Sequence, residues 1–288
     1  MLVADALTAL AAKKEAARKD GKQVSDLEVV VCGRNRLENG SMAAWAKAYA
    51  ANNGVKTIKM TQNGIRQEGI SHLISNGLSH LSKLEEMDLQ DNTFTAMGAN
   101  ALGGVISKWA NLRILGVGDC LLSGRGGITL AAALQKGNNK KLEVLRLFFN
   151  DINAKGLEGL ASAASSALPS LRRVELNGNK FSEDDPSIER LRDLLEERKE
   201  ESGEHADSED YWGLDELDEL ESDDEDESES DEEEKRGEDD DEEGVEVEEK
   251  AARQIVEEQR NEDSNVAQEK DKDVDALADA LAKTEIKK

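Results

Sequence analysis

The sequence contains little of what several protein classes require. Only two of its 288 residues are cysteine, which excludes a disulfide framework, and no CxxC pair or His/Cys cluster indicates zinc. No apolar run reaches about 18 residues, which argues against a membrane-spanning helix. The N-terminal apolar stretch contains Asp5 and follows no basic residues, so it does not resemble a secretory signal. These absences predict a soluble intracellular protein with reduced cysteines.

Acidic residues outnumber basic ones, 63 to 37, and the excess is concentrated in one segment. Residues 1–199 carry a net charge of +4, residues 200–250 carry −27, and residues 251–288 carry −3. A protein of charge −26 is repelled by phosphate, so we expect no direct contact with nucleic acid. A segment so rich in charge cannot bury enough apolar surface to offset its ordering entropy. We therefore expect a folded domain over residues 1–199 and an acidic, largely disordered tail over residues 200–288.

A repeat of 28 to 30 residues runs through the folded part. Six segments fit the frame Lxx(apolar)x(apolar)xxN, and they end at Asn35, Asn63, Asn92, Cys120, Asn150 and Asn179. An apolar residue follows two places later in every repeat, a glycine follows in five of them, and an Ala/Leu-rich stretch comes next. This pattern predicts an α/β solenoid of six leucine-rich repeats, a right-handed βα superhelix of the ribonuclease-inhibitor kind.

Both ends of the array depart from the repeat. Residues 1–19 read as an Ala/Leu helix ahead of the first strand, whereas in the repeat a helix follows its own strand. We therefore expect N-terminal repeats to be missing from this chain. Near the other end, acidic residues and Pro186 replace the usual glycine and suit the start of a helix, which we expect over residues 188–198. We interpret this helix as the C-terminal cap.

Two groups of apolar residues interrupt the acidic tail. Leu214, Leu217 and Leu220 recur every three residues, which is compatible with a short helix or an export-type signal. We favour the simpler interpretation that they are isolated leucines in a disordered chain. A second group predicts a marginal terminal helix that is too short to persist alone, and it consists of Val274, Leu277, Ala278 and Leu281.

The sequence offers few candidates for catalysis. Its three histidines, His72, His80 and His205, are scattered, and no nucleophile–base arrangement accompanies them. The glycines near residues 116–127 do not form a dinucleotide-binding motif, and no phosphate-binding loop is present. We therefore predict no catalytic residue, no metal site and no cofactor.

The strand-to-helix turns are more distinctive than the leucine frame. Residues 31–41, which read VCGRNRLENGS, resemble a segment of the fungal Ran GTPase-activating proteins, the RanGAP family. Residues 60–66, 89–94 and 176–179 resemble the same family in order and register, as does the acidic tail that begins near residues 214–217. The resemblance covers nearly the whole chain and depends on loop strings, which are more specific than the repeat frame.

The resemblance implies a regulator that stimulates GTP hydrolysis by Ran and has no active site of its own. Such a protein stabilises the switch regions of the GTPase and the glutamine that orients the attacking water, in this family without an inserted arginine finger. The family's essential arginine and its glutamine-orienting asparagine lie upstream of the matched repeats, so no residue here is given those roles. The implied partner is a Ran-type GTPase in its GTP-bound form, bound by a monomer. The implied location is the cytoplasm or the cytoplasmic face of the nuclear envelope, in support of nucleocytoplasmic transport.

Charged side chains fixed on a rigid edge are plausible partner contacts, because the scaffold has already ordered them. On this basis we predict that a group of turn residues binds the partner, and the group consists of Arg34, Arg36, Asn39, Arg66 and Asp91.

Two other readings compete with the GTPase regulator. An acidic-tailed leucine-rich-repeat adaptor, or a histone-chaperone-like binding protein, would share the acidic tail but has shorter repeats of about 24 residues. A ribonuclease-inhibitor-like scaffold would be rich in cysteine, whereas this chain has two. The period of 28 to 30 residues favours the GTPase regulator.

Overall fold

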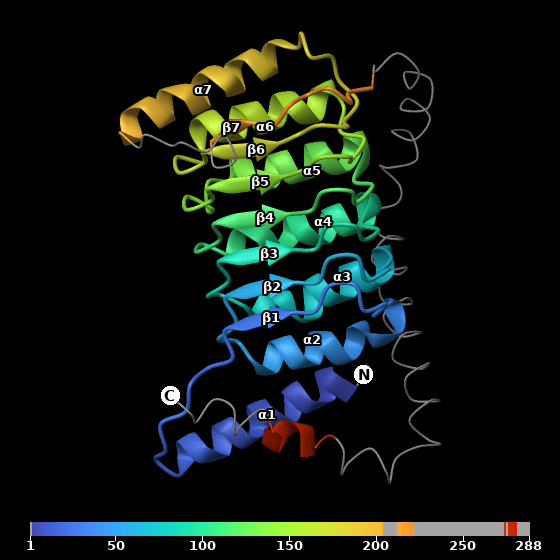
Figure 1. Ribbon diagram of the computed structural model, residues 1–288, viewed down its shortest axis with the longest axis vertical. Helices are drawn as coiled ribbons and strands as arrows, with labels where there is room; N and C mark the ends of the chain where they lie inside the picture. The colour runs from blue at the N-terminus through green and yellow to red at the C-terminus, as the bar shows by residue number, and fades with distance from the viewer. Residues whose placement is uncertain (1, 204–211, 222–273, 275, 281–288) are drawn as a thin grey trace.

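The computed structural model describes residues 2–203, 212–221, 274 and 276–280, and its centre is one parallel sheet. Each strand pairs with the next one along the chain, so the sheet grows in sequence order (Figure 1). The strands are β1 (Val29–Val31), β2 (Thr57–Lys59), β3 (Glu86–Asp88), β4 (Ile114–Gly116), β5 (Val144–Arg146), β6 (Arg173–Glu175) and β7 (Gly213–Leu214). This arrangement confirms the predicted solenoid of leucine-rich repeats.

The register of the sheet is the register of the sequence repeat. The middle residues of neighbouring strands pair with one another, and each is at most 8% exposed: Val30, Ile58, Met87, Leu115, Leu145 and Val174. Because side chains alternate between the faces of a strand, a slip of one residue would turn this apolar row toward solvent. Burial of the row therefore fixes the pairing.

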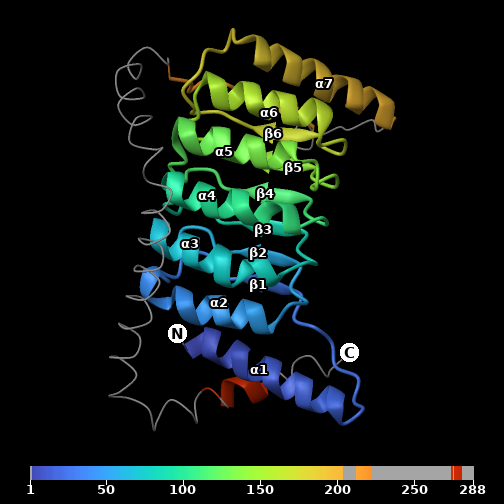
Figure 2. The same ribbon diagram turned by 180° about the vertical axis from the view of Figure 1, so that it is seen from behind.

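Helices cover one face of the sheet and leave the other face open, as the two opposite views show (Figures 1 and 2). The helices are α1 (Leu2–Lys19), α2 (Met42–Ala51), α3 (Gln67–Asn76), α4 (Thr95–Val105), α5 (Ser123–Gln135), α6 (Ala154–Ser166) and α7 (Pro186–Ser202). Short 3-10 helices accompany three of them, at η1 (Asn39–Ser41), η2 (Leu78–His80) and η3 (Ile106–Lys108). The core lies between the helices and the sheet.

The N-terminal helix α1 lies beside α2 and is joined to β1 by residues 20–28. On its other side α1 contacts the helical residues 276–280 near the end of the sequence (Figure 1). Lys13 Nζ lies 2.9 Å from Asp279 Oδ1, and Ala278 is fully buried. The predicted terminal helix is therefore present over its described residues, 274 and 276–280, whereas Leu281 lies outside them.

Helix α7 begins as its sequence predicts. The Asp185 carboxylate accepts a hydrogen bond from the Ser187 amide at 2.7 Å, and Pro186 occupies the first turn, where no amide proton is needed. The helix ends at Gly203, whose φ of 65° is the left-handed conformation that glycine adopts at helix C-termini.

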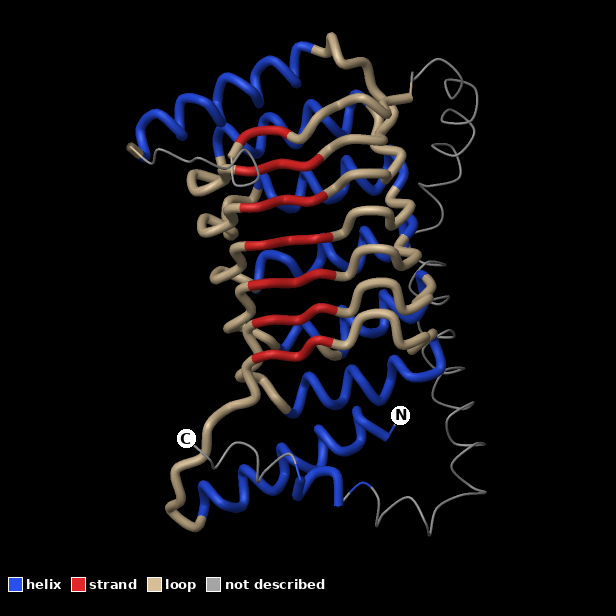
Figure 3. Tube along the Cα trace, in the orientation of Figure 1, coloured by secondary structure: helices blue, strands red, loops and turns tan. Residues whose placement is uncertain are grey.

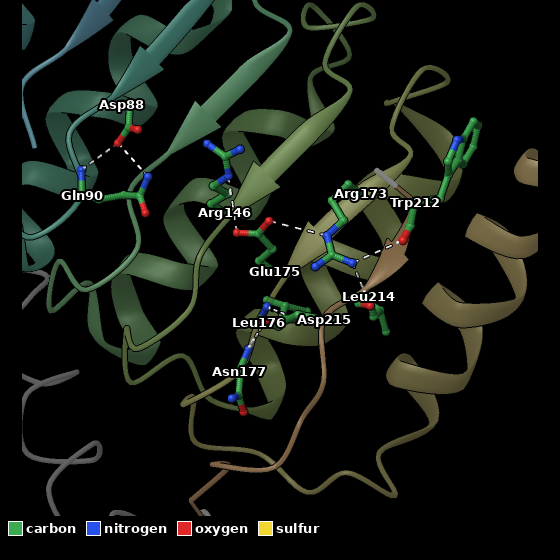
Figure 4. A network of polar contacts seen from close by, with 10 residues as sticks. All are labelled: Asp88, Gln90, Arg146, Arg173, Glu175, Leu176, Asn177, Trp212, Leu214 and Asp215. Atoms are coloured by element: carbon green, nitrogen blue, oxygen red, sulfur yellow. Dashed lines mark hydrogen bonds and ion pairs between the residues drawn. The ribbon is translucent and has the colours of Figure 1, made fainter. Parts of the chain in front are cut away.

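A segment that we placed in the disordered tail belongs to the sheet. Residues 212–221 extend beside β6, and Leu217 is buried. Arg173 donates to the carbonyls of Trp212 at 3.3 Å and Leu214 at 3.1 Å (Figure 4). We call residues 212–221 the closing segment.

The closing segment corrects two of our predictions. Its leucines are neither a helix nor isolated residues in a disordered chain, because β6 offers them a free strand edge and an apolar layer to cover. The repeat domain also extends past residue 199, since α7 runs to Ser202 and the sheet gains β7. The rest of the predicted disordered tail, at 204–211, 222–273, 275 and 281–288, lies outside the described residues, and so does His205.

Candidate partner-binding edge

Six turns lead from strands β1–β6 toward the helices and stack along one edge of the sheet (Figure 3). We call them the turn edge, which comprises residues 33–37, 61–65, 90–94, 118–122, 148–152 and 177–181. Backbone amides of one turn donate to carbonyls of the next, for example Asp91 N to Gly118 O at 3.0 Å and Asp119 N to Phe148 O at 2.8 Å. These bonds hold the backbones of the turns at a fixed spacing, so the points from which the side chains leave are set before any partner binds.

The residue before each frame asparagine or cysteine has a left-handed backbone. The φ angles are 60° at Arg34, 54° at Gln62, 56° at Asp91, 51° at Asp119, 50° at Phe149 and 69° at Gly178. Only the last of these is glycine, although the conformation costs other residues about 1–2 kcal/mol. The five larger side chains are all exposed. The turn therefore presents this position to solvent.

In the second to sixth turns the next residue points the other way, into the solenoid, whereas Asn35 of the first turn is exposed. Asn150 is fully buried, and its Oδ1 accepts the amides of Cys120 at 3.1 Å and Leu122 at 3.3 Å in the preceding turn. Its Nδ2 donates to Val117 O at 2.8 Å and Leu147 O at 3.0 Å. Equivalent bonds are made by Asn63, Asn92 and Asn179. This asparagine ladder satisfies backbone groups that burial would otherwise leave unpaired.

Cys120 weakens the ladder in the fourth repeat. Its thiol makes long contacts with the carbonyls of Gly118, at 3.3 Å, and Leu89, at 3.5 Å. Burial raises the pKa of the Cys120 thiol to about 12, so it remains protonated and acts only as a weak donor. The Phe94 amide instead bonds to the Cys120 backbone carbonyl at 2.9 Å.

A groove of about 570 Å³ runs along the turn edge over the first four repeats. It is lined by Arg34, Arg36, Gln62, Asn63, Gly64, Asp91, Asn92, Thr93, Asp119 and Leu121. Both arginines come from the first turn, whereas the two aspartates come from the third and fourth turns. The groove is therefore positive at one end and negative at the other. The structure thus brings together three of the predicted contacts, Arg34, Arg36 and Asp91.

The charges of the groove differ from those on the open face of the sheet. On that face Lys59 lies 2.7 Å from Glu86, and Arg146 lies 3.4 Å from Glu175 (Figure 4). Within the described residues, by contrast, the side chains of Arg34, Arg36, Asp91 and Asp119 make no ion pair or hydrogen bond. Four exposed charges without a partner among the described residues mark the groove as the surface best suited to binding a charged partner.

The other two predicted contacts, Asn39 and Arg66, do not line the groove. Asn39 Oδ1 accepts the Arg66 amide at 2.8 Å, and its Nδ2 donates to Glu68 Oε2 at 3.0 Å, so this side chain joins the first turn to the start of α3. Burial alone would raise the pKa of Glu68, but hydrogen bonds from its own amide, Gln67 and Asn39 lower it. These contacts give Asn39 a structural role, whereas the Arg66 side chain is exposed beside the groove.

Sequence reasoning missed several residues of the turn edge. Asp119 and Leu121 belong to the groove, and Phe149 is the exposed aromatic residue of the next turn. All three stand directly before or after a frame asparagine or cysteine. Their places in the repeat could have identified them, because Arg34 and Arg36 flank Asn35 in the same way.

The described part of the chain shows no group of three histidine, cysteine, aspartate or glutamate residues that could hold a metal ion. None of its helices is long and apolar enough to cross a membrane.

Comparison with known proteins supports the leucine-rich-repeat fold. A family model described as "Leucine Rich repeat" matches residues 138–161. Ran GTPase-activating protein 1 of Saccharomyces cerevisiae is 35% identical over 199 residues, which is 68% of this chain and 48% of that protein. The chain is a RanGAP-like leucine-rich repeat protein. It spans about half the length of this relative.

The RanGAP-like assignment agrees with the resemblance seen in the turns.

Proposed function

We propose that this RanGAP-like chain binds a Ran-type GTPase in its GTP-bound form through the turn edge and belongs to a GTPase activator. The main support is the likeness to a yeast Ran GTPase-activating protein, together with a groove whose four charged side chains have no partner within the described residues. Arg34 and Arg36 would meet acidic groups of the GTPase, and Asp91 would meet a basic one. Exposed beside the groove, Arg66 would add an outer contact.

The chain would contribute binding and orientation. No residue on its turn edge is assigned the role of the family's essential arginine or glutamine-orienting asparagine. We therefore expect the chain alone to bind the GTPase weakly and to leave its rate of GTP hydrolysis near the intrinsic value.

A single-turnover assay tests both parts of this proposal. Ran loaded with GTP is mixed with an excess of the unaltered chain, and released phosphate is measured over time, while binding is measured with a non-hydrolysable GTP analogue. We expect binding without acceleration. Stimulation close to that of a complete RanGAP would show that residues of this chain perform the activation, and absence of any binding would refute the proposed partner.

The cellular setting of the proposed function follows from the family. We propose a cytoplasmic location, which includes the cytoplasmic face of the nuclear envelope, and a role in nucleocytoplasmic transport as a monomer. The adaptor or histone-chaperone alternative receives less support, because the repeats carry helices of 10 to 13 residues and the chain is 35% identical over 199 residues to a yeast Ran GTPase-activating protein. Localisation by fluorescence microscopy and sedimentation of the purified chain test these points.

A further inference from the structure

An aromatic pair continues the turn edge beyond the groove. Phe148 and Phe149 follow β5, and their rings stand nearly perpendicular, with an interplanar angle of 86° and centroids 6.0 Å apart. Phe149 is 44% exposed, and its φ is 50°. A bulky residue rarely adopts this conformation, and nearly half of Phe149 stays exposed. The position therefore combines an unfavourable backbone conformation with exposed apolar surface.

Glycines in the neighbouring turns make room for both rings. The Phe148 ring covers Gly118 in the turn before, and the Phe149 ring covers Gly178 in the turn after. A Cβ atom at either glycine would overlap the ring. The pair is thus fixed across three turns, so little rotational freedom remains to be lost when a partner binds. Rigid aromatic side chains of this kind are typical centres of binding energy at protein interfaces.

The charges beside the aromatic pair are negative. Asp119 lies in the adjacent turn, where its amide donates to the Phe148 carbonyl at 2.8 Å. Its carboxylate is exposed and has no ion pair within the described residues. On the other side, Asp151 lies 3.6 Å from Lys180, so its charge is largely compensated. Phe149 holds in the fifth turn the position that Asp119 holds in the fourth, so the two side chains leave adjacent turns. Together they suit a lysine or arginine side chain, which can contact the ring and pair with the acid.

We propose that Phe149 and Asp119 form an aromatic–acidic site that receives a basic side chain of the same GTPase partner. The inference depends on the proposed function and extends the partner's contact area from the groove to the fifth repeat. We assign the site to a basic side chain of this one partner, because the site is continuous with the groove and its unpaired charge is negative. The partner surface must then present acidic groups to Arg34 and Arg36 and a basic group to Phe149.

To test the site, we would measure the Kd with which the complete chain binds Ran that carries a non-hydrolysable GTP analogue. Phe149→Asn removes the ring, and asparagine tolerates the left-handed backbone, so folding should be unimpaired or improved while Kd rises about 10-fold to 30-fold. Asp119→Asn should lower the association rate and flatten its dependence on salt. The matched controls lie on the helical face: Ile128→Ala removes an exposed apolar side chain from α5, and Glu158→Gln removes an exposed charge from α6. Neither control should change binding.

A second pair of variants identifies what contacts the ring. Phe149→Tyr keeps an aromatic face and should retain nearly the full affinity, whereas Phe149→Leu keeps apolar area but loses the face and should bind several-fold more weakly. Equal affinity of the leucine variant would overturn the assignment of a basic side chain to the ring.

The outcomes separate this inference from the proposed function. If the unaltered chain does not bind Ran, the proposed function falls, and the aromatic–acidic site loses its assigned partner with it. If the unaltered chain binds and Phe149→Asn binds equally well, only the aromatic–acidic site is overturned. A loss of affinity that melting experiments trace to unfolding of Phe149→Asn would likewise overturn it, because the ring would then be a structural element.

Discussion

The asparagine ladder and the exposed positions of the turn edge occupy adjacent residues and have opposite roles. In the fifth repeat Asn150 is fully buried and bonds to two turns, whereas Phe149, one residue earlier, is 44% exposed. The left-handed backbone at the exposed position is what sends the two side chains in opposite directions. A repeat can thus vary its outer residue freely while the inner one maintains the fold. Changes at inner positions should alter stability, and changes at outer positions should alter binding.

The largest effect is expected at the inner position. Asn150→Ala would leave the amides of Cys120 and Leu122 and the carbonyl of Val117 without their buried partner, so we expect a loss of about 3–5 kcal/mol in the free energy of unfolding. Urea denaturation followed by circular dichroism measures this loss. Cys120→Ala is the matched comparison, and it should cost only about 1–2 kcal/mol because the thiol is a weak donor. Equal costs would contradict the role that we give to the ladder.

The next effect concerns the outer position of the first repeat. Replacement of Arg34 or Arg36 by alanine should weaken binding to Ran by more than about 1 kcal/mol each, because both are exposed charges without a partner in the described structure. The melting temperature should stay unchanged. Lys47→Ala, an exposed charge on α2, is the control and should leave binding intact. Unchanged affinity of both arginine variants would make them ordinary solvated loop residues.

The sequence predicts the buried positions of the repeat better than the exposed positions of the turns. The frame predicted the strands and their register, because each buried side chain recurs at a fixed spacing and burial decides the pairing. The turn edge was only partly predictable: Arg34 and Asp91 were found from their charge, whereas Leu121 and Phe149 carry no charge to single them out. The structural contact of Asn39 with α3 could not be predicted, because it depends on the stacking of two repeats.

The closing segment was unpredictable for a different reason. Its acidic residues resemble those of the tail that follows, and local composition therefore favours disorder. Its order comes from the free edge of β6 and from Arg173, which lie about 40 residues away in sequence. Only a long-range contact distinguishes it from its surroundings.

A smaller effect on stability is expected at Gln62, an exposed turn position that lines the groove. Gln62 has a φ of 54° and is exposed, so Gln62→Gly relieves backbone strain and should stabilise the chain by roughly 0.5–1 kcal/mol. Glycine at an exposed helical site should do the reverse, and Lys47→Gly in α2 should destabilise by about 1 kcal/mol. Thermal unfolding of the two variants decides the matter, and a loss of stability in Gln62→Gly would show that the left-handed turns carry no strain.

The smallest effect concerns pH and the closing segment. Burial raises the pKa of the half-buried Asp215 carboxyl, although the amides of Asn177 at 3.0 Å and Leu176 at 2.8 Å oppose that shift (Figure 4). The folded segment therefore holds a proton more tightly than the unfolded chain. This contribution to stability is complete below the ordinary aspartate pKa of about 4 and declines as pH rises through the raised value.

The closing segment should accordingly bind to β6 more firmly near pH 4 than near pH 7. The Arg172 guanidinium lies over the Trp212 ring, with 5.9 Å between the guanidinium carbon and the ring centroid. The NMR signal of the Trp212 indole therefore reports whether the closing segment is attached to β6. Asp215→Asn should abolish the pH dependence of that signal. Asp218→Asn should preserve it, because Asp218 is exposed and, among the residues that the structure describes, its side chain bonds only to the Asn177 side chain, at 2.8 Å. A pH dependence that survives in Asp215→Asn would place the titrating group elsewhere on the segment.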